Sequence, residues 1–502
     1  MSFRNGRILF YGFAGSNLFF NEVLKLLVQD GHDPKNLAVV TPNGQYRRLY
    51  DDLLPAKNTF YLFERYTEVY RQVRTAPEFT ALREPFPDNC FKVLAADKEG
   101  FRRLASEQQI IHLETIYRIY SDIFRRFQPE YVVFPDIEVV DGYMLYNLAK
   151  TRGVPIAYPF HLRNLGRSVL GSGIREEFPE YFGDETDAGR MQAAKFRNQL
   201  ASGLPEAKHF DPAWAGGRKR SVSRKHILSR FARAVALRLG PERLYRGEDH
   251  FYQKTRIALL SLLEPWRRSK YRALVLPRFQ IRSAAALPPK FCLFALQVTP
   301  ESSINYLSPY YVDQVRAIDE IRLSLPPDTW LVVKEHPAIV GFRPMRFYQD
   351  LLKMPGVLLA DAFLPMETLR DRATVIFTIT GTVGLECLFS AKPCYMFGEN
   401  FFSSYLPNKA NMPDLREFFR SDLQKIMQES VTLFEGDLTK IFSISHSFVL
   451  ADPSAEDHVM LDRNIEHFAL ALEEHFTRLE AWQRLQCTTR APSGSGGQGC
   501  CT

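Results

Sequence analysis

Short apolar runs alternate with amphipathic stretches along the first 160 residues of the chain. Apolar runs of strand length occupy residues 7–11, 36–41, 130–135 and 154–159. Between them, helical spacing of apolar side chains is found at residues 18–29, 112–127 and 142–151. Strands that alternate with helices predict a parallel α/β sheet, and such sheets bind ligands at the carboxyl ends of their strands.

The same alternation returns in the back half. Strands are predicted at 291–297, 330–334, 357–359, 374–378 and 393–397, and helices at 310–323, 347–353, 383–389, 415–429 and 462–485. The fold class is therefore α/β, with two Rossmann-like domains facing across a cleft and joined by a helical connector. We expect a front domain at 1–183, the connector at 184–285, a back domain at 286–450, a terminal helix at 451–487 and a disordered tail at 488–502.

Composition narrows the function classes. The net charge of +7 over 502 residues permits contact with anionic sugars, nucleotides or lipid headgroups without requiring nucleic acid. The seven cysteines form no C-x-x-C pair, which disfavours zinc and favours a reducing compartment. No apolar run approaches the roughly 20 residues of a membrane span. We expect a cytoplasmic protein without a metal or a cofactor.

The predicted strand at 330–334 ends in a loop whose residues suit an anion. Pro337 fixes its own φ and disfavours helix at His336, so the strand must stop there. Lys334 and His336 lie on the same side of an extended chain, and a cation beside a ring N–H donor would suit a phosphate oxygen. The alternative is a loop with a structural histidine.

A second polar loop precedes the predicted helix at 383–389. Thr380, Gly381 and Thr382 offer hydroxyls and backbone N–H groups at a helix N-terminus, which attracts anions. Glu386 lies four residues after Thr382 on the same helix face, where a carboxylate could accept hydrogen bonds from a ribose diol. Gln297 and Glu301 follow the strand at 291–297 and are expected to point into the same cleft. The alternatives are a capping arrangement with Glu386 on the surface, and a capping box around Glu301.

The front domain carries the remaining candidates at two strand ends. Near these ends lie Asp136, Glu138, Asp141, His161, Arg163 and Arg167. The carboxylates and the histidine suit a general base or a nucleophilic carboxylate, and the two arginines suit an acceptor. No single catalytic residue is assigned, and a solvated loop at each strand end is the alternative.

Residues 291–398 resemble the capsule polysaccharide biosynthesis family, which includes bacterial Kdo transferases of capsule lipid anchors. The shared motifs are Leu296-Gln297, Pro300-Glu301, Tyr311 with Gln314, Val333 to Pro337, Thr380 to Glu386, and Lys392-Pro393. Ala391 stands where the family usually has Gly, and Cys387 where it has Ala. The resemblance implies a GT-B fold and sugar transfer from a nucleotide donor, CMP-Kdo in the characterised members.

The His-Pro loop also resembles the CMP-binding elements of bacterial GT-B sialyltransferases. This likeness implies that His336 contacts a CMP phosphate and that Thr380 to Thr382 contact phosphate or a sugar carboxylate. The implied donor-binding set is Gln297, Glu301, Lys334, His336, Thr380, Gly381, Thr382 and Glu386. Helix N-termini and cations would neutralise the leaving group without a metal.

The expected function is a metal-independent glycosyltransferase of surface polysaccharide synthesis. Its partners would be a nucleotide-sugar donor, with CMP-linked sugars favoured, and a glycolipid or oligosaccharide acceptor, but not nucleic acid. The basic segment 218–238 could rest on the inner membrane, or it could be a solvated helix face. Two other functions stay open: a nucleotide-sugar epimerase of the same fold, and a non-catalytic polysaccharide assembly or export factor.

Overall fold

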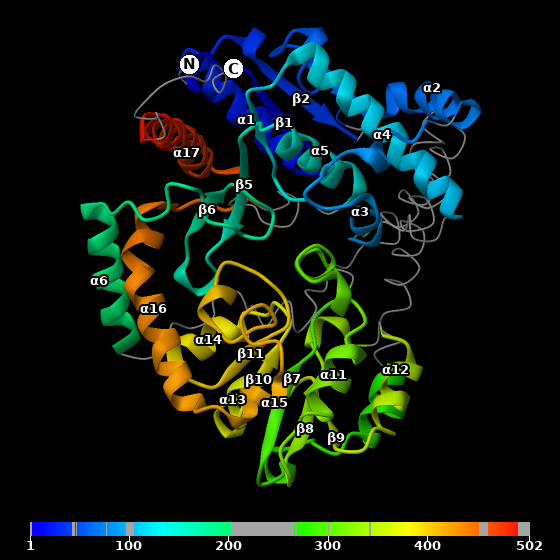
Figure 1. Ribbon diagram of the computed structural model, residues 1–502, viewed down its shortest axis with the longest axis vertical. Coiled ribbons are helices and arrows are strands. Elements are labelled where there is room, and N and C mark those ends of the chain that lie inside the picture. Colours follow the sequence, from blue (N-terminus) through cyan, green and yellow to red (C-terminus); the bar gives the residue numbers. More distant parts are fainter. Residues whose placement is uncertain are drawn as a thin grey trace, which may run out of the picture.

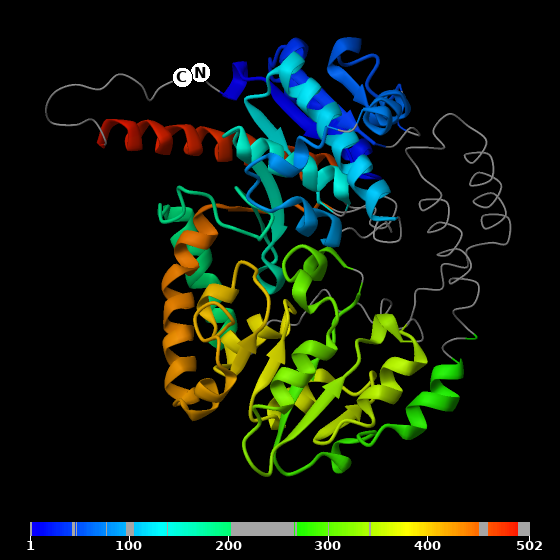
Figure 2. The same cartoon turned by 45° about the vertical axis from the view of Figure 1, so that its right-hand side comes forward.

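The computed structural model describes residues 3–489, apart from 43–45, 47, 77, 97–104, 138, 202–265, 267–268, 300, 341–342 and 451–459. The basic segment 218–238, Glu138 and residues 490–502 of the predicted tail therefore lie outside the described residues. The described chain forms two α/β lobes, one above the other in Figures 1 and 2. The domain boundaries drawn from the sequence stay a prediction.

The first lobe is built on a seven-stranded sheet with the order β12-β6-β5-β4-β1-β2-β3. Its strands are β1 (Ile8–Tyr11), β2 (Leu37–Thr41), β3 (Thr59–Tyr61), β4 (Tyr131–Val133), β5 (Ile156–His161), β6 (Ser168–Gly171) and β12 (Ser445–His446). Strands β1 to β5 are parallel, whereas β6 runs antiparallel to β5 and β12 antiparallel to β6. The predicted parallel sheet is thus confirmed, with an antiparallel edge that was not predicted.

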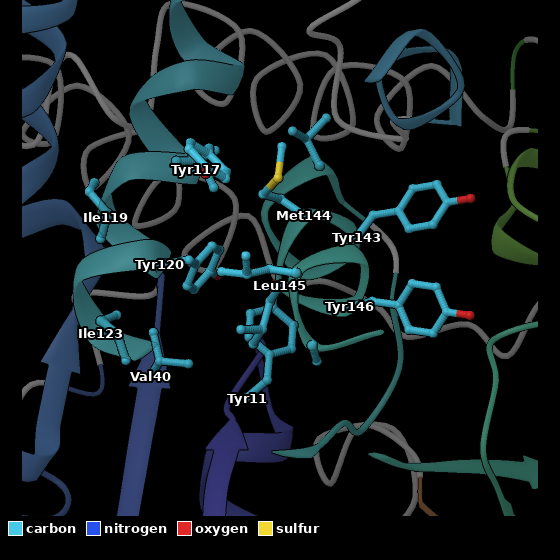
Figure 3. Close-up of a cluster of buried hydrophobic side chains, with 14 of the residues drawn as sticks. Tyr11, Val40, Tyr117, Ile119, Tyr120, Ile123, Tyr143, Met144, Leu145 and Tyr146 are labelled. Atoms are coloured by element: carbon cyan, nitrogen blue, oxygen red, sulfur yellow. The ribbon is translucent and has the colours of Figure 1, made fainter. Parts of the chain in front are cut away.

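Alternate residues of these strands pack into two separate hydrophobic cores on opposite faces of the sheet, because successive side chains of a strand point to opposite faces. Leu9, Tyr11 and Val40 pack against the helices on one face, and Figure 3 shows Tyr11 and Val40 beside side chains of α4 and α5. Ile8 and Phe10 face the other way. The first face carries α2 (Leu62–Thr75), α3 (Cys90–Ala96), α4 (Ser106–Phe127) and α5 (Val140–Thr151), and the second carries α1 (Ser16–Gln29) and α17 (Asp462–Thr489).

The second lobe is built on a five-stranded, fully parallel sheet with the order β11-β10-β7-β8-β9. Its strands are β7 (Phe291–Ala295), β8 (Trp330–Lys334), β9 (Val357–Ala360), β10 (Ile376–Thr378) and β11 (Cys394–Met396). Helices α13 (Met366–Arg372) and α14 (Val383–Ser390) pack on one face. Helices α11 (Val315–Arg322), α12 (Met345–Leu351) and α15 (Leu415–Arg420) pack on the other. The α/β class predicted from the sequence is confirmed.

The chain then returns to the first lobe. Helix α16 (Leu423–Ser443) packs along α6 (Asp187–Ala201) and leads into β12 of the first sheet (Figure 1). Helix α17 completes the return by packing against α1, where Phe468 meets Phe19 with ring centroids 5.2 Å apart. The C-terminal segment is therefore part of the first lobe's core.

Three predicted boundaries need correction. The helix expected at 310–323 starts only at Val315, after a 3-10 turn at Pro309–Tyr311. The helix expected at 415–429 is two helices, because the Asp422 side chain accepts a hydrogen bond from the Lys425 N–H at 3.1 Å and starts α16. The terminal helix expected at 462–485 continues to Thr489.

Candidate functional site

The carboxyl ends of the two sheets face each other. In the second lobe, Tyr306 follows β7, and its ring meets that of Tyr143 at the start of α5 with centroids 4.8 Å apart. Phe401 follows β11 and stacks on Phe160 of β5 at 5.9 Å. Because β4 and β5 end beside Tyr143 and Phe160, these contacts join the strand ends of one lobe to the strand ends of the other. Ligands of parallel α/β sheets bind at such edges.

Gln297 lies at the centre of the second edge, directly after the central strand β7. The donors around it favour a side-chain oxygen that accepts from the Thr380 N–H at 2.9 Å, with the amide nitrogen donating to Thr380 Oγ1 at 3.0 Å. This orientation leaves the single Thr380 hydroxyl proton for the Ser303 carbonyl, 3.0 Å away. Gln297 therefore braces the turn at Thr380 and Gly381 against the loop after β7.

Of the two threonines in the Thr380–Thr382 turn, only Thr382 has an exposed side chain. Thr380 is buried, and its carbonyl accepts from the Asn400 side chain at 3.1 Å. Thr382 is exposed at the first position before α14, and its side chain makes no capping hydrogen bond. A Cβ on Gly381 would lie 2.6 Å from Thr378 Oγ1. Glycine therefore fits best between the side chains of Thr378 and Gln297. Any hydroxyl that this turn offers to a ligand comes from Thr382.

Lys334 is held away from solvent. Its ammonium group donates to the Ala362 carbonyl after β9 at 2.7 Å, and burial lowers its pKa to about 8. The side chain therefore links the ends of β8 and β9 and stays mainly protonated at neutral pH. It supplies positive charge to this edge from a buried position.

His336, two residues later, is neutral at pH 7. Burial, with the charges of Lys334 and Arg343, lowers the pKa of its imidazole to about 4. The ring can therefore offer one N–H donor and one acceptor nitrogen, as the expected phosphate contact requires, but it adds no charge.

Glu335 is a central residue of this edge that sequence reasoning missed. Its buried carboxylate accepts from Arg343 at 2.7 Å and from the Tyr348 hydroxyl at 2.7 Å. Arg343 also donates to the Gln297 carbonyl, which connects the loops after β7 and β8. The available signal was the strand period, since Glu335 must point away from Lys334 and His336.

The other two donor candidates are engaged within their own lobe. Glu386 forms an ion pair with Arg370 at 2.9 Å, and burial raises the pKa of its carboxyl above the usual value despite that cation. Glu301 accepts from the Ser303 hydroxyl at 2.8 Å inside its own turn. Their proposed ribose and donor contacts stay predictions.

The front-domain candidates occupy the opposite edge. Asp136 accepts from the Tyr158 hydroxyl at 3.1 Å, and buried Asp141 accepts from the Tyr11 hydroxyl at 3.2 Å. His161 Nδ1 lies 2.6 Å from Ser168 Oγ, whose proton goes to the Phe448 carbonyl. The His161 ring therefore carries its proton on Nδ1, which leaves Nε2 as the basic nitrogen.

The two arginines predicted to bind acceptor differ in their surroundings. Arg163 pairs with Glu176 at 2.6 Å and lies over the Phe401 ring, 6.0 Å from its centroid, at the boundary between the lobes. Arg167 donates to the Ser445 hydroxyl at 2.7 Å and to the Ser447 hydroxyl at 3.2 Å, which fixes β12 to the first sheet. Burial lowers the pKa of Arg167.

Within the part of the chain that the structure describes, no three His, Cys, Asp or Glu side chains converge in a way that could hold a metal ion. Among the described helices, none combines the length and the apolar character that crossing a membrane requires.

Residues 266–405, which include the strands β7 to β11 and the loops that follow them, match the family described as capsule polysaccharide biosynthesis protein. This segment of the chain is similar to the capsule polysaccharide biosynthesis family. The resemblance inferred from the motifs is confirmed. The family match covers the Gln297 brace, the Lys334–His336 loop and the Thr380–Thr382 turn.

Two curated relatives match parts of the chain. The chain is 29% identical over 175 residues to the capsule polysaccharide export protein KpsS of Escherichia coli, a match covering 32% of this chain and 43% of KpsS. It is 27% identical over 123 residues to protein FixF of Sinorhizobium fredii (strain NBRC 101917 / NGR234), covering 23% of this chain and 28% of FixF. The matches thus span less than half the length of these relatives.

Among solved structures, the chain is similar to Thermosulfurimonas dismutans KpsC, a beta Kdo 2,7 transferase. The sequences are 14% identical, the comparison covers 76% of this chain and 94% of KpsC, and the TM-score is 0.29.

Proposed function

We propose that this protein is a glycosyltransferase of the capsule polysaccharide biosynthesis family, which moves a sugar from a nucleotide donor to a glycolipid or oligosaccharide acceptor. One observation carries the proposal: the family's Gln297-braced turn lies at a sheet edge that faces the strand ends of the first lobe. Such an arrangement suits a reaction between two substrates, because each lobe can hold one of them. The second lobe would hold the donor and the first the acceptor.

In this proposal the donor phosphate lies beside the Gly381–Thr382 turn. The N–H groups that begin α14 and the Thr382 hydroxyl would donate to its oxygens, and neutral His336 would add a ring N–H. Buried Lys334 would contribute positive charge without direct contact, which lowers the cost of the charge left on the departing nucleotide. Gln297 and Thr380 would hold the turn in place.

The first lobe would supply the acceptor side. Nε2 of His161 is a candidate general base, and Asp136 and Asp141 are the candidate carboxylates within the described residues. Arg163, at the lobe boundary, is the better placed of the two arginines to meet an anionic acceptor, because Arg167 is occupied by β12. Contact of residues 218–238 with the inner membrane stays a prediction.

A thermal-shift panel of CMP, UDP, CDP and GDP tests the donor half. Selective stabilisation by CMP is expected, because a ligand that binds only the native state raises Tm by mass action. His336→Ala should reduce the shift, whereas His467→Ala, on α17 in the first lobe, should leave it unchanged. Stabilisation by UDP alone would refute the CMP preference, and no response to any nucleotide would refute the donor site.

The similarity to KpsS, a capsule polysaccharide export protein, favours one second candidate: a non-catalytic polysaccharide export factor. A chromosomal His336→Ala variant separates the two. Loss of surface polysaccharide with normal protein level supports transfer chemistry. Normal polysaccharide in that variant, together with its loss in a deletion strain, supports the export factor.

A further inference from the structure

Asn305 is a buried amide whose polar atoms have no partner. It ends the short helix α10 (Ser302–Asn305), and its relative exposure is 0%. Within the described structure, neither its Oδ1 nor its Nδ2 makes a hydrogen bond. A buried amide without hydrogen bonds is costly, and such a group in a native fold calls for an explanation. A ligand that is bound only during function is one such explanation.

The position of Asn305 connects it to the proposed donor site. Two residues earlier, the Ser303 carbonyl accepts from the Thr380 hydroxyl at 3.0 Å. The next residue, Tyr306, meets Tyr143 of the first lobe, and α10 also contacts α3. Asn305 therefore lies between the braced turn and the first lobe.

Neighbouring asparagines show that this edge normally satisfies its buried amides. Asn400 donates to the Thr380 carbonyl at 3.1 Å and accepts from the Phe402 N–H at 3.1 Å. Asn408 donates to the Ser403 carbonyl at 2.6 Å and accepts from the Ala410 N–H at 2.8 Å. Unlike Asn400 and Asn408, Asn305 has a side-chain amide that makes no hydrogen bond within the described structure.

We propose that Asn305 binds the hydroxyl groups of the sugar in the nucleotide-sugar donor. The inference rests on the proposed function and extends it from the phosphate to the transferred sugar. A neutral amide offers two donors and an acceptor, which match hydroxyl groups better than they match a phosphate. The sugar must also lie nearer the first lobe than the phosphate does, because the acceptor attacks it from there. Since Asn305 is fully buried, the sugar reaches it through a local displacement of α10.

The experiment compares Asn305→Leu with a matched control, Asn400→Leu. Leucine at 305 removes an unsatisfied amide, so the Tm of the ligand-free protein should stay unchanged or rise. Leucine at 400 leaves the Thr380 carbonyl and the Phe402 N–H without their partner, so its Tm should fall by about 4 °C or more. This contrast separates a ligand contact from a structural one.

Affinities for CMP and for CMP-Kdo, measured by calorimetry, complete the test. In the wild type CMP-Kdo should bind more tightly than CMP, and Asn305→Leu should lose about tenfold in CMP-Kdo affinity with CMP affinity retained. A variant that keeps the full preference for CMP-Kdo overturns the inference, as does a wild type that binds both equally. A wild type that binds no nucleotide refutes the proposed function itself.

Discussion

At the scale of single residues, the site depends on close approach around Gly381. A methyl group there would lie 2.6 Å from Thr378 Oγ1 and 2.7 Å from the nearer atom of the Gln297 side-chain amide, inside the braced turn. Gly381→Ala should therefore cost on the order of 1–3 kcal/mol of stability, because a well-packed site must shift to admit it. The loss is measured as a lower Tm and a weaker nucleotide-induced shift.

Gly436 provides the matched control for this substitution. It lies exposed in α16, and nothing lies within 4 Å of an added Cβ. Gly436→Ala should raise stability by roughly 0.5–1 kcal/mol, because alanine is the better helix former. Equal effects of the two substitutions would contradict the role given to Gly381.

The partners of individual residues were only partly predictable. Gln297 and Thr380 could be expected to meet, because their strands are buried, parallel and followed by polar loops. The Glu386 contact could not, because its partner Arg370 lies on α13, whose short sequence gives a weak helical signal. The Glu386 carboxylate was thus assigned to a ligand, although it forms an ion pair with Arg370 of the same lobe.

At the scale of elements, the C-terminal helix α17 stabilises the first lobe by packing into its core. Phe476 of α17 is fully buried and packs on Phe3 at 5.3 Å and on Tyr131 at 4.5 Å between ring centroids. Phe476→Ala should cost about 3–5 kcal/mol, because it leaves a cavity among rings from three distant segments. Leu485→Ala, on the same helix but 64% exposed, should change stability by less than about 0.5 kcal/mol. Thermal denaturation of both variants measures the difference, and similar Tm values would show that α17 is not part of this core.

Element prediction was successful where the hydrophobic period was long or the strand fully buried. Strands β1, β2, β7 and β8 and helix α1 all appear within two residues of their predicted bounds. Strand β12 could not be predicted, because two residues, Ser445 and His446, carry no period and pair only through the distant β6. The antiparallel edge depends on contacts such as Arg167 with Ser445, 278 residues apart in the chain.

At the scale of the whole molecule, the two lobes meet through rings and a few charged groups. Arg175 of the first lobe pairs with Glu399 of the second at 3.3 Å and with Asp88 at 3.4 Å. These partly exposed ion pairs contribute little stability, about 0–1 kcal/mol each. The stacking of Phe401 on Phe160 and the edge-to-face contact of Tyr306 with Tyr143 bury apolar surface and contribute more. Much of the lobe contact therefore lies beside the candidate site, so a ligand there would bias the arrangement of both lobes.

Buried histidines make the folded state of the molecule sensitive to mild acid. Burial lowers the pKa of His112 to about 3 and of His336, His446 and His475 to about 4. In the unfolded chain these rings have pKa values near 6.5, so the unfolded state binds protons first as the pH falls. Stability is fully present above about pH 6.5 and decreases from there towards pH 4, by on the order of 2 kcal/mol for each such ring at pH 5.

His475 allows this acid effect to be assigned. Its ring accepts from the Tyr181 hydroxyl at 2.9 Å and donates to the Ile156 carbonyl at 3.0 Å, so both nitrogens are used by the neutral form. Tm should decrease between pH 6.5 and pH 5, where most carboxylates stay ionised. His475→Gln should flatten that decrease, because an amide cannot take up the proton. A Tm that stays constant over this interval would mean that the buried rings are protonated equally in both states.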